Sequence, residues 1–390
     1  MKRFLNTPKQ SASNRTPREI NRNLIFNLIR RRQPISRADL ARLSGLQRST
    51  VSLIVEELIV DRWILEGATG KLPRGRHPTH LNLNLQRSVL AIDIHPSQTT
   101  IGVADIAGNV LSQSAVAIPK DPTKAINAII ALARKMIIAH PQNSFEGIGI
   151  CLPGRTDLDT RKLIFAPNLH WPVLTIKPRI QRATSLRVEM DNVANACALS
   201  EVWFGDGETP HDRVVVNVSE GIGTGIFANG ELIRGEKGMA GEFGHVQLDP
   251  AGPPCACGSN GCWETLASNT AALRYYSKFS GAKSAAKKKE IDFRGLVELA
   301  HTGDKHALHA LEETALNLGR GVRMIASALA PQEIVIVGDI VNAWDIVGPI
   351  AQAELDRNSL SRATNLRPSA EGAQARLRSA VALVLSAGFI

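Results

Sequence analysis

The stretch GEFGHVQLDPAGPPCACGSNGCWETL, residues 241–266, places one histidine and three cysteines within eighteen positions. They supply one imidazole and three thiolates, a soft donor set that suits a tetrahedral zinc ion and leaves no open position for a catalytic water. The pattern therefore predicts a structural zinc site, and the alternative is a metal-free cluster of buried thiols. The predicted ligands are His245, Cys255, Cys257 and Cys262.

The other cysteines do not extend this pattern into a disulfide framework, because five cysteines form an odd set and three of them are crowded together. No apolar run reaches the roughly 18–20 residues that span a bilayer. The first residues, MKRFLNTPKQSASNR, are basic and polar and lack the apolar stretch of a signal peptide. We therefore expect a cytoplasmic protein with no membrane segment.

The positive charge of the chain is concentrated near its start. Residues 1–90 carry 17 Lys and Arg against 6 Asp and Glu, a net charge of +11, whereas the remaining 300 residues carry 29 against 30. A basic module joined to a nearly neutral body is typical of a DNA-binding domain attached to a domain with another role. The expected partner is double-stranded DNA.

Apolar spacing within the basic module predicts a helix-turn-helix. After a flexible basic tail over residues 1–17, a helical pattern runs from Arg18 to the stretch RRRQP, where Pro34 stops it. Ser36 is placed to cap a short second helix, which ends at a tight Ser44-Gly45 turn. A third helix follows in QRSTVSLIVEELIVDRWI. Its apolar stripe consists of Val51, Ile54, Val55 and Leu58.

The outer face of the third helix is expected to contact base edges near the helix start. There, Arg48 is suited to a bidentate pair with guanine and Gln47 to a pair with adenine. A helical hairpin used for protein contacts is the alternative. The DNA-contacting residues predicted in this part of the module are Arg37, Gln47, Arg48, Ser49 and Ser52.

The next segment, LEGATGKLPRGRHPTHLNLN, places turn residues between two short strand-like pieces, which predicts a winged helix-turn-helix over residues 18–82 and a linker over residues 83–88. Within it, Arg74 and Arg76 flank a glycine. The backbone can therefore lie low in a narrow minor groove while both guanidinium groups enter its negative potential. A solvated basic loop is the alternative.

The body of the chain mixes short β-branched strands with helical stretches. Predicted strands lie in SVLAIDIHPSQTTIGVADIAGNVLSQSAVAI, FEGIGICLPGRTD, DRVVVNVSEGIGTGIFANGELI and EIVIVGDI, and predicted helices include residues 124–139, 194–204, 311–330 and 375–388. Strands and helices alternating over about 300 residues favour a two-lobed α/β body.

Several motifs of the body resemble the ROK family (repressors, open reading frames and sugar kinases), in family order over nearly everything after residue 85. They are IDIHPSQTTIGVADIAGNVL, LPG, APNLHW, DNVANACALSE, GIGTGIFANGELIRG, GEFGH, CACGSNGCWE and IVIVGD. The resemblance implies an actin-like, ribonuclease-H-like body. Its first lobe would comprise residues 89–193 with a C-terminal helix over 375–390, and its second lobe residues 194–374 with the zinc motif.

The same resemblance implies a sugar pocket beside the zinc loop. The loop would hold the carboxylates of Glu242 and Glu264 toward the sugar hydroxyls, and His245 would reach the sugar through its second ring nitrogen. For the two glutamates, solvated loop charges are the alternative. The positions that match the sugar-contacting residues of the family are Gly154, Asn168, Asn192, Glu242, His245 and Glu264.

The motifs for phosphoryl transfer depart from those of ROK kinases, whose first strand is followed by Asp-x-Gly-Gly-Thr. This chain has His95 and Pro96 in place of the two glycines, and proline has no N–H to offer a phosphate. Aligning the following helix places Val193 at the catalytic aspartate, although a slipped register would offer Asp191. The second glycine loop, residues 221–225, is intact. We therefore expect no catalytic residues and no kinase activity.

Family members that carry a winged helix-turn-helix are transcriptional repressors, usually sugar-responsive. The resemblance and the charge distribution together predict a repressor of carbohydrate uptake or catabolism genes, acting as a homodimer or tetramer on a palindromic operator, with a sugar or sugar-phosphate effector. The first alternative is an ATP-dependent sugar kinase that also binds DNA. The second is a constitutive DNA-binding protein with a vestigial sugar fold.

Overall fold

We analysed a computed structural model of the 390-residue chain. The residues that it describes are 17–69, 79–96, 98–157, 162–166, 169, 171–205, 212–281, 291–357, 362–370 and 375–389. Contacts between residues divide the chain into two compact units, Met1–Arg87 with Gly388–Ile390, and Ser88–Ala387. Within the described residues, none of the helices combines the length and the apolar character needed to cross a membrane.

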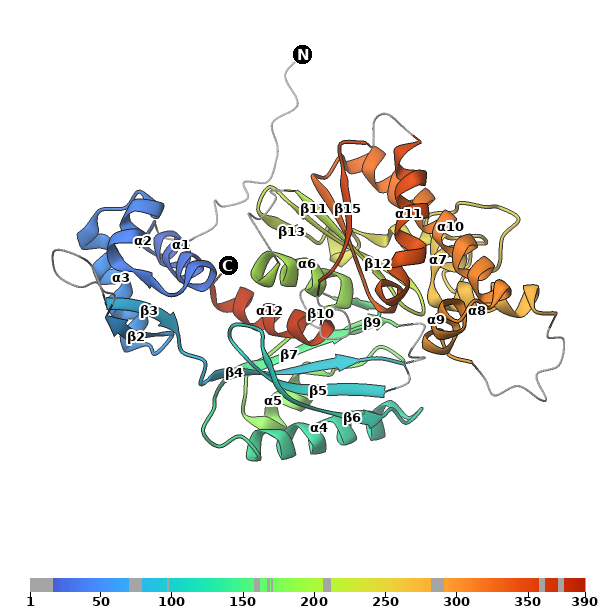
Figure 1. Cartoon of the computed structure of the whole chain (residues 1–390). Helices are drawn as coiled ribbons and strands as arrows, with labels where there is room; N and C mark the ends of the chain where they lie inside the picture. Colours follow the sequence, from blue (N-terminus) through green and yellow to red (C-terminus); the bar gives the residue numbers. More distant parts are fainter. Residues whose placement is uncertain are drawn as a thin grey trace, which may run out of the picture. The chain divides into compact units, whose positions relative to one another are not determined.

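The first unit consists of three helices and a small sheet (Figure 1). The sheet is antiparallel, with the strand order β1-β3-β2. The predicted basic tail lies outside the described residues except for Pro17, which begins the first helix. The elements are α1 (Pro17–Arg32), β1 (Ile35–Ser36), α2 (Arg37–Ser44), α3 (Arg48–Val60), β2 (Ile64–Thr69) and β3 (Thr79–Leu83).

Local caps set the ends of α2, and apolar packing holds α3. The Ser36 hydroxyl accepts a hydrogen bond of 3.2 Å from the Asp39 N–H, and Gly45 ends α2 with a φ of +70°, where glycine carries no steric penalty. Along α3, the four residues of the predicted apolar stripe are all buried. Ion pairs from Arg18 to Glu57 and from Arg22 to Asp61 join α1 to α3 at the surface, where such pairs contribute little.

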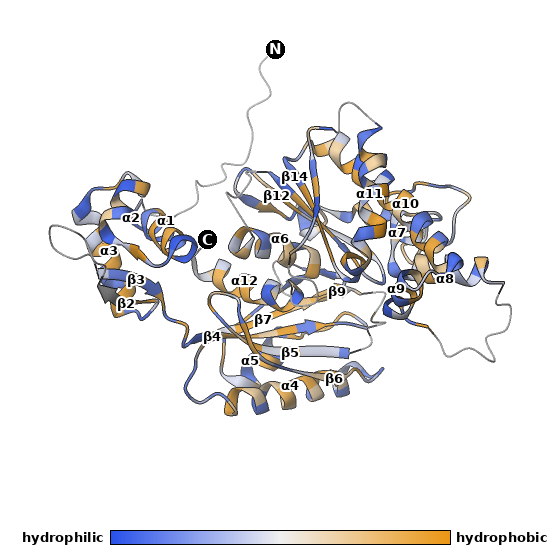
Figure 2. Ribbon diagram, viewed as in Figure 1, coloured by the Kyte–Doolittle hydropathy of each residue, from blue (hydrophilic) through white to orange (hydrophobic). Residues whose placement is uncertain are grey.

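The first lobe of the second unit is built on a five-stranded sheet of order β10-β7-β4-β5-β6. Strands β4, β5 and β6 pair antiparallel, as expected for two consecutive hairpins, and β10 pairs parallel to β7. The central strands β4 and β7 are largely orange in Figure 2, because both are buried along most of their length. The strands are β4 (Arg87–Ile94), β5 (Gln98–Asp105), β6 (Val110–Ala117), β7 (Ser144–Leu152) and β10 (Val188–Asn192).

Helices cover both faces of this sheet. In Figure 1, α4 (Pro122–Ile138) and α5 (Lys177–Thr184) lie on one face and α12 (Ala375–Phe389) on the other. The approach of α12 is close, because a Cβ built on Gly149 would lie 1.8 Å from the carbonyl oxygen of Ala380. Only glycine fits at that position of β7.

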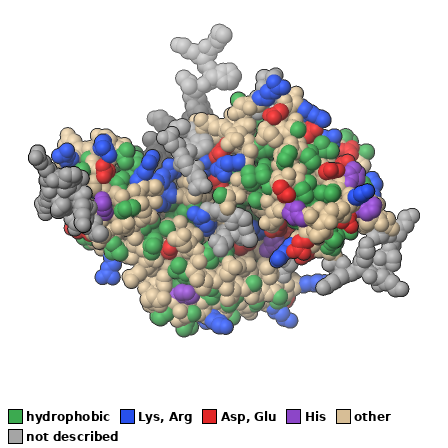
Figure 3. Space-filling view, in the orientation of Figure 1, with side chains coloured by type: hydrophobic (Ala, Val, Ile, Leu, Met, Phe, Trp, Pro, Cys, Tyr) green, Lys and Arg blue, Asp and Glu red, His purple; other side chains and the backbone are tan. Residues whose placement is uncertain are grey.

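The second lobe has a five-stranded sheet of order β13-β12-β11-β14-β15, which packs against α6 on one face and against the helices around α10 on the other (Figure 1). Its strands are β11 (Arg213–Val218), β12 (Ile222–Ala228), β13 (Glu231–Ile233), β14 (Glu333–Val337) and β15 (Asn365–Pro368). Its helices are α6 (Val193–Phe204), α7 (Trp263–Ala267), α8 (Asn269–Phe279), α9 (Phe293–His301), α10 (Lys305–Leu329) and α11 (Trp344–Asp356). Acidic, basic and histidine side chains are mixed on the face of this lobe shown in Figure 3.

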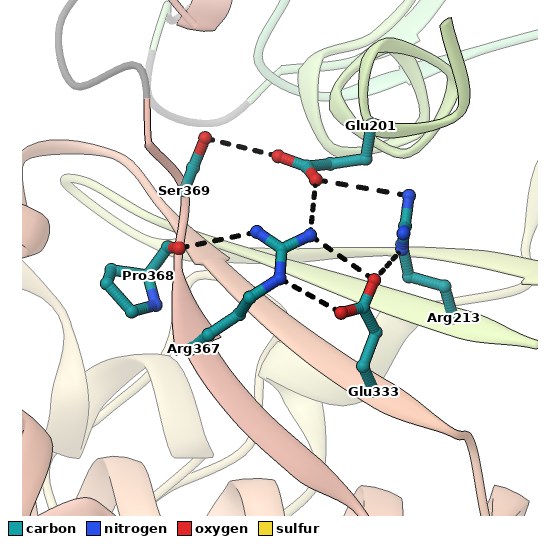
Figure 4. Close-up of polar contacts among 6 residues, drawn as sticks. All are labelled: Glu201, Arg213, Glu333, Arg367, Pro368 and Ser369. Carbon is teal, nitrogen blue, oxygen red and sulfur yellow. Dashed lines mark hydrogen bonds and ion pairs between the residues drawn. The ribbon is translucent and has the colours of Figure 1, made fainter. Parts of the chain in front are cut away.

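A buried ionic network fixes α6 to the second sheet (Figure 4). Arg367 on β15 contacts Glu333 on β14 at 2.9 Å and Glu201 on α6 at 2.8 Å. Arg213 on β11, whose side chain is 2% exposed, also pairs with Glu333. Ser369 donates a hydrogen bond of 3.1 Å to the second oxygen of Glu201. Burial lowers the pKa of Arg367, but the two carboxylates outweigh it and raise that pKa, so the guanidinium stays charged.

Candidate metal centre and adjoining pocket

The predicted zinc ligands meet at one point of the second lobe. His245 ends the 3-10 helix η3 (Glu242–His245), and the three cysteines follow in the loop that leads to α7. One ligand atom of each residue lies within 4.8 Å of those of the other three. The Cys257 and Cys262 sulfurs are 3.6 Å apart, close to the roughly 3.8 Å that a tetrahedral ion with bonds of about 2.3 Å imposes on two sulfur ligands. This cluster fits a metal ion.

The loop is closed by backbone geometry that two glycines allow. Gly258 and Gly261 both have positive φ values, +96° and +59°. A Cβ built on Gly261 would lie 1.6 Å from the carbonyl oxygen of Asp249, so no other residue fits there without moving the chain. Cys255 donates its N–H to the Ser259 carbonyl at 2.8 Å. The cysteine sulfurs are therefore positioned by the backbone around them.

Next to the cluster lies a pocket to which both lobes contribute. The first lobe supplies the turn after β4, the turn after β7 and the end of β10, and the second lobe supplies the start of α6, the β11–β12 turn, η3 and α7. Its lining includes His95, Pro96, Gly154, Arg155, Asn192, Val193, Asn217, Ser219, Glu220, Glu242, His245, Glu264 and Arg376.

Five of the six predicted sugar positions line this pocket, and the sixth, Asn168, lies outside the described residues. Asn192 and Gly154 are held together by a hydrogen bond of 2.7 Å from the Asn192 Nδ2 to the Gly154 carbonyl. The Asn192 side-chain oxygen caps α6 by accepting the Ala194 N–H at 2.8 Å. The remaining three positions are Glu242, His245 and Glu264.

His245 stands between the cysteine cluster and the pocket. Its Nδ1 lies 3.5 Å from the Cys255 sulfur and 3.4 Å from Glu264 Oε1. Its Nε2 lies on the side of Glu242, 3.7 Å from Oε2. One ring nitrogen therefore faces the cysteine cluster, and the other faces Glu242.

The turns that would hold phosphates in a kinase carry two ion pairs. His95 Nε2 in the β4–β5 turn lies 2.9 Å from Glu220 Oε2 in the β11–β12 turn, so this contact joins the two lobes. Arg376 on α12 pairs with Asp93 at 2.8 Å. Burial raises the pKa of Glu220, but the hydrogen bond and the charge of His95 outweigh it and lower that pKa. Burial raises the pKa of Asp339, which follows β14.

The second glycine loop is explained by helix packing. A Cβ built on Gly225 would lie 2.3 Å from the Ala194 carbonyl oxygen, and one on Gly223 would lie 3.2 Å from the Ala194 Cβ. These glycines let β12 approach α6 closely. Gly225 is therefore required by the fold whether or not a phosphate binds there.

Val193, which one of the two predicted registers places at the kinase aspartate, lines the pocket and is buried. Asp191, the residue of the alternative register, lines a neighbouring cavity. Its carboxylate accepts a hydrogen bond from Asn195 at 3.1 Å and pairs with Arg234 at 3.0 Å. Both oxygens of Asp191 are thus occupied. This contact also joins the lobes, because Arg234 follows β13.

Polar lining residues that were not predicted from the sequence are Arg155, Asn217, Ser219, Glu220 and Arg376. Glu220 directly precedes the glycine loop, and that position was a usable signal. No sequence signal pointed to Arg376, because it is 283 positions away from its partner Asp93. Only the tertiary fold brings the two together.

In the first unit, the predicted DNA-contacting residues at the start of α3, Gln47, Arg48, Ser49 and Ser52, are exposed. Arg37 differs from them, because it pairs with Glu66 at 2.7 Å and with Glu56 at 3.7 Å and is only 29% exposed. Arg74 and Arg76 lie outside the described residues.

Comparison with known proteins agrees with this geometry. The ROK family model matches residues 89–387. The Xylose repressor of Bacillus subtilis is 32% identical over 365 residues, which cover 92% of this chain and 93% of that protein. A crystal structure of a ROK family transcriptional regulator, a homologue of the E. coli MLC protein, is 26% identical and matches 95% of this chain and 96% of its own, with a TM-score of 0.78.

A kinase also matches, but only the body. The ROK family glucokinase from Streptomyces griseus, in complex with glucose and AMPPNP, is 28% identical with a TM-score of 0.70, and the match covers 77% of this chain and 99% of the kinase. The repressors match the N-terminal unit in addition to the body. From the family match and the shared length, the chain belongs to the ROK family.

Proposed function

We propose that the protein is a sugar-responsive, DNA-binding transcriptional repressor that senses its sugar without phosphorylating it. The observation that carries the proposal is the pocket, where five predicted sugar positions lie beside the His/Cys cluster. The names of the full-length relatives agree with it, since they include a Xylose repressor and a ROK family transcriptional regulator. The effector would be a sugar or a sugar phosphate.

In this proposal the His/Cys cluster holds a structural zinc ion. His245, Cys255, Cys257 and Cys262 would supply all four ligands, so the ion would brace the loop and offer no open coordination position. The chain's own residues would bind the effector. Glu242 and Glu264 would accept hydrogen bonds from sugar hydroxyls. The hydrogen bond to Gly154 fixes the position of the Asn192 side chain at the pocket.

The alternative, an ATP-dependent sugar kinase, is disfavoured by the phosphate side of the cleft. Pro96 has no N–H to donate, and the Glu220 carboxylate lies where the first and second loops meet. A carboxylate there repels the phosphates of ATP. Val193 cannot accept a proton from an attacking hydroxyl, as a general base must.

DNA binding is assigned to the first unit. The exposed start of α3 would contact base edges, with Arg48 and Gln47 as the reading residues, and the basic residues around it would contact phosphates. Arg74 and Arg76 would enter the minor groove. Two such units in a homodimer or tetramer would read a palindromic operator, with recognition helices about 34–36 Å apart or a multiple of that distance.

The test compares sensing with phosphorylation in one preparation. The purified full chain is incubated with ATP, magnesium and a panel of hexoses and pentoses, and ADP release and binding to operator-containing DNA are measured together. The proposal predicts DNA binding that one of the sugars weakens, with no sugar-dependent ADP. Sugar-dependent ADP release at about 1 s⁻¹ or faster, an ordinary enzyme rate, would establish the kinase instead.

A further inference from the structure

The pocket extends beyond the predicted sugar positions. Besides the residues around the metal centre, it is lined on the phosphate side by a second set of polar side chains. We call this set the second subsite. Its members are His95, Asn217, Ser219, Glu220 and Arg376. Both sets line one continuous pocket, so a ligand that fills the first set can continue into the second.

Asn217 is the clearest sign of a ligand there. It lies on β11 and is only 3% exposed, yet among the described residues its side-chain oxygen has no hydrogen-bond partner. Buried amide oxygens are nearly always paired, because leaving one without a donor is costly. The Nε of Arg376 is likewise buried without an acceptor. An unpaired acceptor and an unpaired donor therefore belong to two side chains that line the pocket.

The charges of the second subsite favour a neutral ligand. Arg376 already pairs with Asp93 at 2.8 Å, and His95 pairs with Glu220 at 2.9 Å. The Asp339 carboxylate interacts with the same groups. Within the second subsite each cation thus already pairs with a carboxylate, so an anionic ligand gains little from them. Hydroxyl groups can donate and accept hydrogen bonds at the Asn217 amide and the Arg376 guanidinium without adding charge.

We propose that the second subsite takes a second sugar unit, so that the effector is an uncharged disaccharide. This inference rests on the proposed function and names its ligand class. One unit would lie against Glu242, His245 and Glu264, and the other against Asn217 and Arg376. The half of the cleft that takes nucleotide in a kinase would then be an extension of the sugar site in this chain.

The test measures the affinity of the zinc-containing full chain for matched pairs, by calorimetry: xylose with xylobiose, and glucose with cellobiose and with maltose. Glucose 6-phosphate and magnesium-ATP are the anionic probes. We expect one disaccharide to bind about tenfold more tightly than its own monosaccharide. We expect the anionic probes to bind more weakly than either.

Substitutions test whether the higher affinity for a disaccharide comes from the second subsite. Asn217→Ala should remove the advantage of the disaccharide and change monosaccharide affinity by less than about twofold, since the first set of residues is untouched. The matched control is Asn342→Ala, an exposed asparagine of the same lobe outside the pocket, which should change neither. His95→Ala, in a turn, is the second variant and should act like Asn217→Ala even if the buried substitution hinders folding.

Three results would overturn the inference. Monosaccharides binding as tightly as their disaccharides, with DNA release intact, would refute the second subsite and leave the proposed function standing. Tighter binding of glucose 6-phosphate or of ATP than of the neutral sugars would show that the second subsite is an anion site. Binding of no sugar at all, in a chain that still binds DNA, would refute the sensing function itself and the second subsite with it.

Discussion

Asn192 donates a hydrogen bond of 2.7 Å from its Nδ2 to the carbonyl of Gly154, and through its other side-chain atom caps α6. These two pocket residues come from different turns, yet each fixes the position of the other. The start of α6 is thereby joined to the turn that follows β7. If the pocket binds a sugar as proposed, sugar binding and helix stability are coupled at this contact.

Asn192→Ala should therefore lower both the stability of the protein and its affinity for the sugar. Loss of the cap should cost about 1 kcal/mol of unfolding free energy, and sugar affinity should fall with it. Asn192→Asp keeps a capping oxygen but loses the donor to Gly154, so it should retain most of the stability and still weaken sugar binding. Denaturant unfolding and calorimetry on the two variants would separate the effects. Equal sugar affinity in all three proteins would exclude Asn192 from the site.

The ionic network of the second lobe predicts a large loss of stability. Glu333→Ala removes a carboxylate shared by Arg213 and Arg367, and leaves Arg213 buried without its closest partner. Breaking a buried pair in this way costs about 3–5 kcal/mol. The control is Glu298→Ala on α9, whose partner Arg294 is largely exposed, with an expected change of less than about 1 kcal/mol. A similar small change for both variants would show that the network is not stabilising.

The lobe-to-lobe pair of His95 and Glu220 predicts a dependence on pH. Because His95 lowers the pKa of Glu220, the pair stabilises the folded chain at pH values above the ordinary carboxyl value of 4.5, and this contribution is lost as the pH falls through the lowered pKa. The stability difference between the wild type and Glu220→Gln should thus be present at neutral pH and should vanish in acid. Unfolding curves at a series of pH values would measure it. A difference that grows toward low pH would have the wrong sign.

The metal centre predicts that zinc and effector response are lost together. Cys257→Ser removes one of four ligands, and the loop that holds Glu242 and Glu264 should then lose its shape. Elemental analysis would measure zinc, and thermal shift with the effector would measure the response. Cys151→Ser, at a buried cysteine of the first lobe outside the cluster, is the control and should keep its zinc. A variant without zinc that still responds to sugar would show that the metal does not shape the pocket.

For DNA recognition, substitution of Arg48 gives the most specific prediction. Arg48→Ala should weaken operator binding by about 1–3 kcal/mol and relax the preference at one base pair, because a base-reading arginine contributes both. The control is Arg62→Ala, which changes an exposed arginine beyond the end of α3. Any loss of affinity in this variant should be the same for all DNA sequences. Fluorescence anisotropy with operator and mismatched duplexes would distinguish the two. Undiminished specificity in Arg48→Ala would remove it from the reading face.

Much of this architecture could be predicted from the sequence because it rests on short-range patterns. The stripe of α3, the Ser36 cap and the spacing of the cysteines are each contained within about twenty residues. The start of α10 was predicted six residues too late, although Asp304 accepts the N–H groups of His306 and Ala307 and caps the helix at Lys305. The Asp304 cap is a local sequence signal for this helix start.

What could not be predicted depends on contacts between distant segments. Arg37 meets Glu66 only because β2 folds back beside α2, and the pattern of either segment alone gives no hint of the pair. In the same way, Asn217 and Arg376 reach one pocket from β11 and α12. The second subsite therefore became visible only with the fold.

Control of DNA binding by a sugar bound in the body of the same chain can be measured by titrating sugars into a complex of the full chain with labelled operator and following anisotropy. We expect one sugar to change operator affinity by about 5- to 150-fold, the usual range for coupled sites, and Glu264→Gln to abolish the change. An operator affinity that no mono- or disaccharide alters would contradict this control of DNA binding.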